Sequence, residues 1–153
     1  MGILTDSLLP KDIRLDLRAS DPQDAFEEVL SSLRSDSRVR DWEKLRASLH
    51  ENRPTEALRE SLGTMCLHHG RTDSVSGLVL AAGRSAEGMT VPGSQTRIHL
   101  VFVAAIPEAL SNEYLRILGA ISRVCREPAS LEELRTAPDA GAFLSMLERG
   151  CRA

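Results

Sequence analysis

Apolar residues recur every third or fourth position in the first third of the chain and again in the last third. This spacing places them along one side of an α-helix. Asp21 and Pro22 predict a helix start, because aspartate caps helix N-termini and proline suits the first turn. Further helices are predicted to begin near Asp41, at Ser111 or Asn112, at the capping-box pair Ser130 and Glu133, and near Asp139, with a short helical turn from Thr55.

The middle of the chain has a different pattern, which predicts strands over residues 64–68, 77–82 and 98–106. The third stretch is almost continuously apolar, as expected of a central strand that is covered on both faces. Residues 84–97 contain glycine and proline, which predicts a loop or a hairpin there. Residues 13–17 alternate in polarity, which indicates an extended segment packed on one face.

Helical segments precede and follow the strands, so both faces of the predicted sheet can be covered. We therefore expect an α/β fold, a single-domain helix–sheet–helix sandwich over residues 1–153. A length of 153 residues is typical of one domain.

Composition narrows the class of protein. A formal charge of −3 argues against a nucleic-acid binder, which would show a basic stripe. The three cysteines are widely spaced without a CxxC pair, which favours a reducing cytoplasm over a disulfide framework. The longest apolar run, 100–106, is far shorter than a membrane span, and no signal peptide is readable. We expect a cytoplasmic protein without membrane insertion.

The densest group of reactive side chains lies at residues 67–73, where the first predicted strand is expected to end in a loop at Gly70. His69 stands at that junction, which would expose its imidazole and orient it. Arg71 and Arg59 could supply positive charge, and a guanidinium matches the geometry of phosphate. A neutral imidazole beside an arginine is sufficient for phosphoryl transfer, which depends on positioning and charge stabilisation.

Two other interpretations of these residues remain open. His69 could simply end a strand and bond locally. A metal site could instead use His68, His69 and Asp73, although neighbouring residues of a strand point to opposite faces. The glycine-rich phosphate loop, the dinucleotide fingerprint and the GxSxG nucleophile elbow are all missing from the sequence.

The segment His69-Gly70-Arg71-Thr72-Asp73 resembles the one at the phosphorylated histidine in phosphotransferase-system IIA proteins of the mannitol, fructose and nitrogen-regulatory class. Further segments resemble this family in the same order along nearly the whole chain. They are residues 15–17, 57–60, 77–83, 100–107, 115–118 and 131–147.

The resemblance implies a mixed sheet flanked by helices, and a phosphocarrier without a cofactor. His69 would accept a phosphoryl group from a histidine phosphocarrier protein. Arg59 would stabilise that group, with Arg71 and Tyr114 as assisting residues. In the nitrogen-regulatory branch, which we favour, such a protein regulates sensor kinases or ion transporters, whereas in the sugar branch it passes the phosphoryl group to a IIB domain.

The sequence also departs from the family pattern. Tyr114 stands where the family has a second active-site histidine, and His68 stands where it often has proline. The loop before His69 is shorter. Tyrosine can donate a hydrogen bond to phosphate but carries no positive charge. These departures motivate the alternative, a phosphorylation-incompetent interaction module with the IIA fold.

Overall fold

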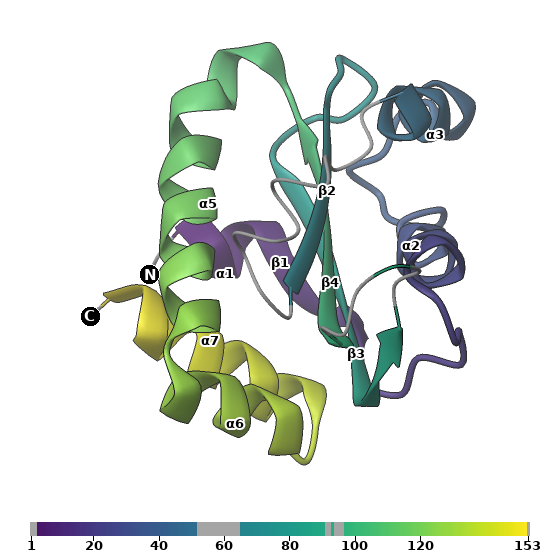
Figure 1. The fold of residues 1–153 in the computed structure, drawn as a ribbon. Coiled ribbons are helices and arrows are strands. Elements are labelled where there is room, and N and C mark those ends of the chain that lie inside the picture. Colours follow the sequence, from purple (N-terminus) through teal and green to yellow (C-terminus); the bar gives the residue numbers. More distant parts are fainter. Residues whose placement is uncertain (1–2, 52–64, 91–92, 94–96, 153) are drawn as a thin grey trace.

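The computed structural model describes residues 3–51, 65–90, 93 and 97–152. Its centre is a four-stranded sheet with the spatial order β1-β3-β4-β2 (Figure 1). β1 pairs with β3 and β2 pairs with β4 in parallel, whereas β3 and β4 are antiparallel, so the sheet is mixed. The strands are β1 (Leu8–Arg14), β2 (Met65–Arg71), β3 (Val79–Thr90) and β4 (Arg97–Ile106).

Helices cover both faces of this sheet, which confirms the predicted sandwich (Figure 1). The short 3₁₀ helix η1 (Glu108–Leu110) leads from β4 into α5. One face carries α1 (Ile3–Ser7), α5 (Ser111–Arg126), α6 (Pro128–Thr136) and α7 (Ala140–Arg152); the other carries α2 (Pro22–Ser31) and α3 (Trp42–Glu51).

β4 contributes side chains to both cores. Phe102 and Ala104 belong to the core beneath α5 and α7, whereas Val101 and Val103 belong to the core beneath α2 and α3. Every residue of β4 after Arg97 is buried, as predicted for a central strand. Two-sided burial explains why this stretch lacks the polar alternation of a half-exposed strand.

Three of the predicted helix starts are confirmed by their capping hydrogen bonds. The carboxylate of Asp21 accepts from the backbone N–H of Asp24 at 2.9 Å, with Pro22 at the first helical position. The carboxylates of Asp41 and Asp139 make the equivalent bonds to the third residues of their helices.

The other two predicted caps are wrong. The side chains of Ser111 and Asn112 do not cap α5; the helix includes Ser111, and its hydroxyl donates to the carbonyl oxygen of Glu108 at 2.9 Å. α6 begins at Pro128, so Ser130 lies inside its first turn. Proline has a backbone angle suited to the first helical position, and here it starts the helix before the capping box.

The strands are longer than their apolar runs predicted. β2 continues through Gly70 and Arg71, which pair with Ala105 and Ile106, so the expected loop at Gly70 is wrong. β3 pairs with β4 as far as Thr90, opposite Arg97, so the described residues 84–90 belong to an antiparallel strand pair. The extended segment near the N-terminus is β1, Leu8–Arg14, which overlaps the predicted stretch 13–17 only at its start; residues 15–17 lie beyond the strand. The turn predicted from Thr55 lies outside the described residues.

A buried charged cluster joins β1 to the segment between α2 and α3. The side chains of Asp12 and Asp36 are each 1% exposed. Arg38 donates to Asp36 at 2.8 Å and to Asp12 at 3.2 Å, and Lys11 donates to Asp36 at 2.8 Å. Arg38 also donates to the carbonyl oxygen of Ser7 at the end of α1, so one guanidinium connects three segments.

Burial and the adjacent carboxyl of Asp36 raise the pKa of Asp12 to about 6. The guanidinium of Arg38 holds the pKa of Asp36 well below its ordinary value. Asp12 therefore contributes stability that is fully present below its unfolded-state pKa and is lost as the pH rises through about 6. Asp36 contributes stability that is lost only at more acidic pH.

We predict that Asp12→Asn, whose amide stays neutral, gains stability over the wild type as the pH rises from 4.5 to 7.5. The expected gain in the free energy of unfolding is on the order of 2 kcal/mol, measured by urea denaturation at both pH values. Asp16→Asn, an exposed aspartate of the same region, is the matched control. An Asp12→Asn curve parallel to the wild type across this range would contradict the assignment.

Candidate functional site

His69 lies near the carboxyl end of β2, an outer strand of the described sheet, opposite Ala104 of β4. The His69 side chain lies on the same face of β2 as Met65 and Leu67, which pack into the core beneath α5. The His69 ring lies 5.6 Å from the ring of Tyr114 on α5, centroid to centroid, at a tilt of 41°. The residue is half-buried, so the imidazole is packed on the phenol and still accessible.

His68 points to the opposite face, as the alternation predicted. It is 4% exposed and stacks on Phe26 of α2 with ring centroids 4.1 Å apart. Its Nε2 lies 3.6 Å from the Sγ of Cys66. These contacts make His68 a packed structural residue of the core beneath α2.

Arg71 follows His69 by two residues and shares its side of β2. The guanidinium is exposed, and its Nε donates to the Oγ of Ser111 at 3.1 Å. The structure therefore brings together His69, Arg71 and Tyr114. The predicted Arg59 lies outside the described residues.

The surroundings of the two rings keep both uncharged near neutral pH. Burial lowers the pKa of His69, and the positive charge of Arg71 lowers it further. Burial raises the pKa of the Tyr114 phenol, an effect that Arg71 partly opposes. A neutral imidazole has a lone pair for nucleophilic attack, and a neutral phenol can donate one hydrogen bond.

Two buried polar atoms of this site have no hydrogen-bond partner among the described residues. They are the Nδ1 of His69 and the hydroxyl oxygen of Tyr114. Leaving such atoms unsatisfied costs free energy, so each is suited to an additional group that binds at the site.

The proposed metal ligands do not converge. His68 and His69 lie on opposite faces of β2, and Asp73 forms an ion pair with Lys44 of α3. Within the part of the chain that the structure describes, no group of three or more His, Cys, Asp or Glu residues is arranged to hold a metal ion.

A cavity of about 280 Å³ flanks the end of β2 on its α3 side. Six residues line it, namely Lys44, Ser48, Arg71, Thr72, Asp73 and Glu108. The cavity shares Arg71 with the His69 site, whereas His69 and Tyr114 are not among its described lining residues. The residues that line it include both positively and negatively charged side chains.

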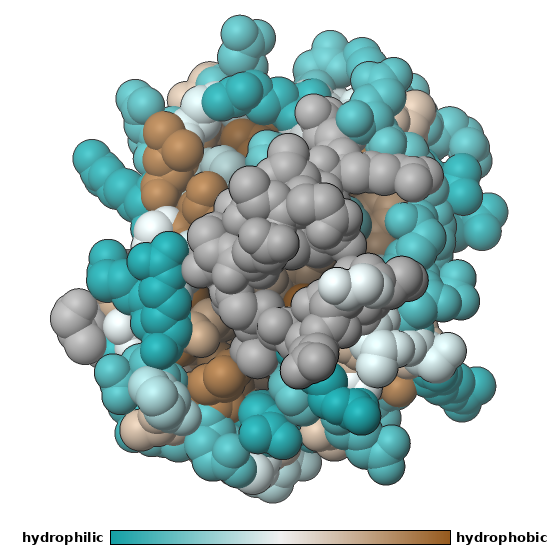
Figure 2. Space-filling model, viewed as in Figure 1, coloured by the Kyte–Doolittle hydropathy of each residue, from teal (hydrophilic) through white to brown (hydrophobic). Residues whose placement is uncertain are grey.

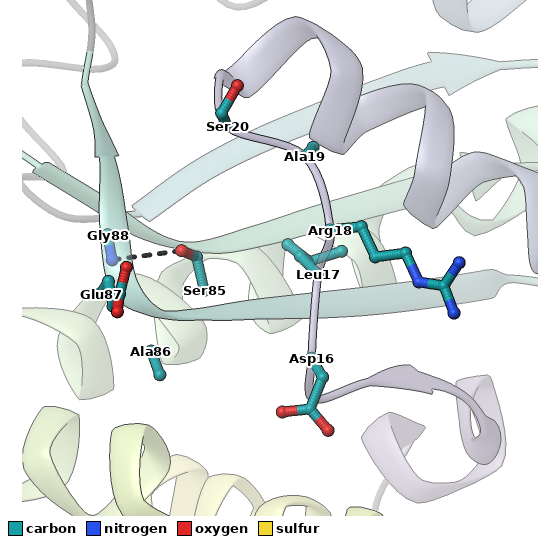
Figure 3. A pocket seen from close by; sticks show the side chains of 9 residues that line it. All are labelled: Asp16, Leu17, Arg18, Ala19, Ser20, Ser85, Ala86, Glu87 and Gly88. Atoms are coloured by element: carbon teal, nitrogen blue, oxygen red, sulfur yellow. Dashed lines mark hydrogen bonds between the residues drawn. The ribbon is translucent and has the colours of Figure 1, made fainter.

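A second cavity, of about 410 Å³, lies between residues 16–20 and residues 85–88 (Figure 3). The Oγ of Ser85 accepts from the backbone N–H of Gly88, and the guanidinium of Arg18 points away from both. The backbone N–H groups of Arg18 and Ala19 bond the carboxylate of Glu28. Among its described lining residues there is no histidine or cysteine, and no reactive group comparable to His69.

The surface next to Tyr114 carries an exposed apolar side chain. Leu115 is 56% exposed, and Figure 2 shows hydrophobic side chains over the first half of α5. Charged and polar side chains dominate the periphery of this view. Among the described helices, none is long and apolar enough to cross a membrane.

Residues 7–150 match the family described as "Phosphoenolpyruvate-dependent sugar phosphotransferase system, EIIA 2". The chain belongs to this family. It is a IIA phosphocarrier of the phosphotransferase system, as the resemblance of its sequence predicted. No curated protein matches the chain by sequence.

Solved structures of IIA proteins share this fold. The nitrogen regulatory protein IIA-Ntr of Neisseria meningitidis is 22% identical, with a TM-score of 0.75 over 95% of this chain and 99% of that one. Enzyme IIAMtl of Escherichia coli, solved in a complex with phosphorylated IIBMtl, is 18% identical, with a TM-score of 0.69 over 94% and 98%. The cryptic mannitol-specific enzyme IIA CmtB of Escherichia coli is 19% identical, with a TM-score of 0.66 over 95% and 98%.

One polar contact of the site was not predicted from the sequence. Ser111 was interpreted only as a helix cap, yet it binds Arg71. The sequence did hold one indication of this contact: Ser111 and Tyr114 are three residues apart, and residues at this spacing share one side of a helix.

Gly70 allows α3 to approach the strand beside His69. A Cβ at this position would lie 3.2 Å from the carbonyl oxygen of Ser48 and 3.3 Å from its carbon. We predict that Gly70→Ala lowers the free energy of unfolding by about 1–3 kcal/mol, because α3 must move away from the strand. Gly77→Ala, where the added Cβ meets nothing within 4 Å, is the control and should be nearly neutral in urea denaturation. Equal stability of the two variants would show that α3 is not held against Gly70.

Proposed function

We propose that this IIA protein is a nitrogen-regulatory-type phosphocarrier that accepts a phosphoryl group on His69 from a histidine phosphocarrier protein. The observation that supports His69 as the acceptor most strongly is its half-buried imidazole packed on Tyr114, with Arg71 on the same side of β2. Across the sheet, His68 is enclosed by Phe26 and Cys66.

In the proposed reaction a lone pair of the neutral His69 ring attacks the phosphorus of the donor's phosphohistidine. A nitrogen–phosphorus bond forms on His69 as the donor's nitrogen–phosphorus bond breaks, and its electron pair returns to the donor imidazole. The low pKa of His69 keeps the ring in its nucleophilic form. Arg71, with Arg59 as the predicted second guanidinium, balances the negative charge of the phosphoryl oxygens.

Similarity to IIA-Ntr supports the nitrogen-regulatory assignment. For this role we propose sensor kinases or ion transporters as downstream partners. Similarity to IIAMtl, solved with phosphorylated IIBMtl, keeps transfer to a IIB domain as the competing route. Incubation of the phosphorylated chain with a IIB domain distinguishes the two roles. The regulatory role predicts that the chain retains its phosphoryl group, and the sugar role predicts that it loses the group to the IIB domain.

We predict that the chain gains one phosphoryl group when incubated with phosphoenolpyruvate, the first enzyme of the phosphotransferase system and the phosphocarrier. Intact mass under non-acidic conditions measures the gain, because phosphohistidine is acid-labile. His69→Ala should abolish it, whereas His68→Phe, which keeps a ring against Phe26, should retain it.

Failure of the folded wild type to gain mass with a cognate donor would overturn the carrier assignment. It would favour a phosphorylation-incompetent interaction module with the IIA fold. Loss of phosphorylation in His68→Phe but not in His69→Ala would show that His68, and not His69, is the acceptor.

A separate prediction concerns Tyr114. Its buried hydroxyl has no partner among the described residues, and a phosphoryl oxygen on His69 would supply one. Tyr114→Phe should shorten the half-life of phosphohistidine about tenfold, the loss expected for a hydrogen bond to a charged group. Stability of the unphosphorylated protein should not fall, since no described bond is removed. The phosphohistidine half-life at pH 7.5, followed by intact mass, tests this.

Tyr114→His is the informative companion variant. An imidazole at this position can become positively charged, so it should make the half-life depend on pH between about 6 and 8. In the wild type, Tyr114 stays protonated through this range. Identical half-lives in the wild type and Tyr114→Phe would contradict a role for the phenol.

A further inference from the structure

Arg71 has a long and exposed side chain, which would sample many conformations if nothing held it. In the structure its Nε donates to the Oγ of Ser111 at 3.1 Å. This bond joins the end of β2 to the first residue of α5 across 40 positions of sequence. Arg71 therefore has a defined partner at the entrance to the site.

The direction of this bond is determined by a second one. The hydroxyl of Ser111 donates its only proton to the carbonyl oxygen of Glu108 at 2.9 Å. Its oxygen can therefore only accept from Arg71. Ser111 also lies where η1 passes into α5, and the Leu110 N–H bonds the carbonyl of Pro107, so the backbone there is well fixed.

Ser111 uses only one edge of the guanidinium. The Nε is occupied, while the two terminal nitrogens of Arg71 have no hydrogen-bond partner among the described residues. Ser111 and Tyr114 are three residues apart on α5 and share a side of the helix. Arg71 lies on the same side of β2 as His69, whose ring packs on Tyr114, so the guanidinium is on the side of the sheet that carries both rings. Its positive charge adds to burial in lowering the pKa of His69 and partly opposes the rise that burial causes in the pKa of Tyr114.

We propose that Ser111 is a positioning residue, which holds Arg71 through its Nε and leaves the terminal guanidinium nitrogens available to a phosphoryl group on His69. This role rests on the proposed function for its effect on phosphoryl transfer. The effect of Ser111 on the unphosphorylated site is independent of the proposed function, because the Arg71–Ser111 bond exists there already.

Substitution of Ser111 by threonine should keep the bond to Arg71, whereas substitution by alanine should remove it. Ser111→Thr retains an Oγ that can donate to Glu108 and accept from Arg71. Ser111→Ala removes the acceptor and frees the guanidinium. Ser130→Ala, a serine in the first turn of α6, is the matched control for loss of a hydroxyl near a helix start.

The test has two readouts. The first is the NMR titration of His69 in the unphosphorylated chain, with its signal assigned by comparison with His69→Ala. Ser111→Ala should raise the His69 pKa towards that of Arg71→Gln, and Ser111→Thr should restore the wild-type value. Adding Ser111→Ala to Arg71→Gln should cause no further change, because the two residues act through one bond.

The second readout is the rate of phosphoryl transfer from the phosphocarrier. In single-turnover kinetics Ser111→Ala should lower the transfer rate constant at saturating phosphocarrier about threefold to tenfold, with little change in the half-saturating concentration, as expected for the loss of one hydrogen bond that orients a charged group. Ser111→Thr should rescue most of this loss, and Ser130→Ala should transfer at the wild-type rate.

An unchanged His69 titration in folded Ser111→Ala, with a raised pKa in Arg71→Gln, would overturn the positioning role. Transfer at the wild-type rate in Ser111→Ala would overturn it as well. Failure of the proposed function is distinguishable, since it would abolish phosphorylation of the wild type while leaving the titration of His69 responsive to Ser111→Ala. Circular dichroism of each variant checks that α5 remains folded.

Discussion

The parallel pairing of β2 with β4 is the interaction on which the candidate site depends. It places His69 opposite Ala104, on the side of the sheet that α5 covers. The two cores enforce this register, because Leu67 packs into one and Cys66 into the other. A slip by one residue would send His69 to the α2 side and leave both sets of side chains in the wrong environment.

The same pairing determines the electrostatics of the site. His69 and Arg71 lie on one side of β2, so the guanidinium helps to keep the imidazole neutral while Ser111 restrains it. The segment after β2 is held by hydrogen bonds to the segment between α2 and α3. Arg40 donates its backbone N–H to the carbonyl of Ser74, and this connection adjoins the buried cluster of Arg38 and two aspartates. The loop that follows the site is therefore attached to the charged cluster of β1.

Much of this arrangement could be predicted from the sequence, because its determinants are local. The apolar run of β4, the caps at Asp21, Asp41 and Asp139, and the opposite orientations of His68 and His69 follow from periodicity and capping chemistry. The ends of β2 and β3 could not, because pairing with β4 extends them beyond their apolar runs. The Arg71–Ser111 bond and the buried pair of aspartates join residues distant in sequence, and single positions carry no signal for such contacts.

The central claim is that β2 presents His69, on its α5 side, and not the neighbouring His68, as the phosphoryl acceptor. The most direct measurement locates the phosphoryl group in the phosphorylated wild type by electron-transfer fragmentation of its peptides at non-acidic pH. This account predicts the group on His69, with His68 unmodified. A phosphoryl group on His68, or on a residue outside β2, would contradict it.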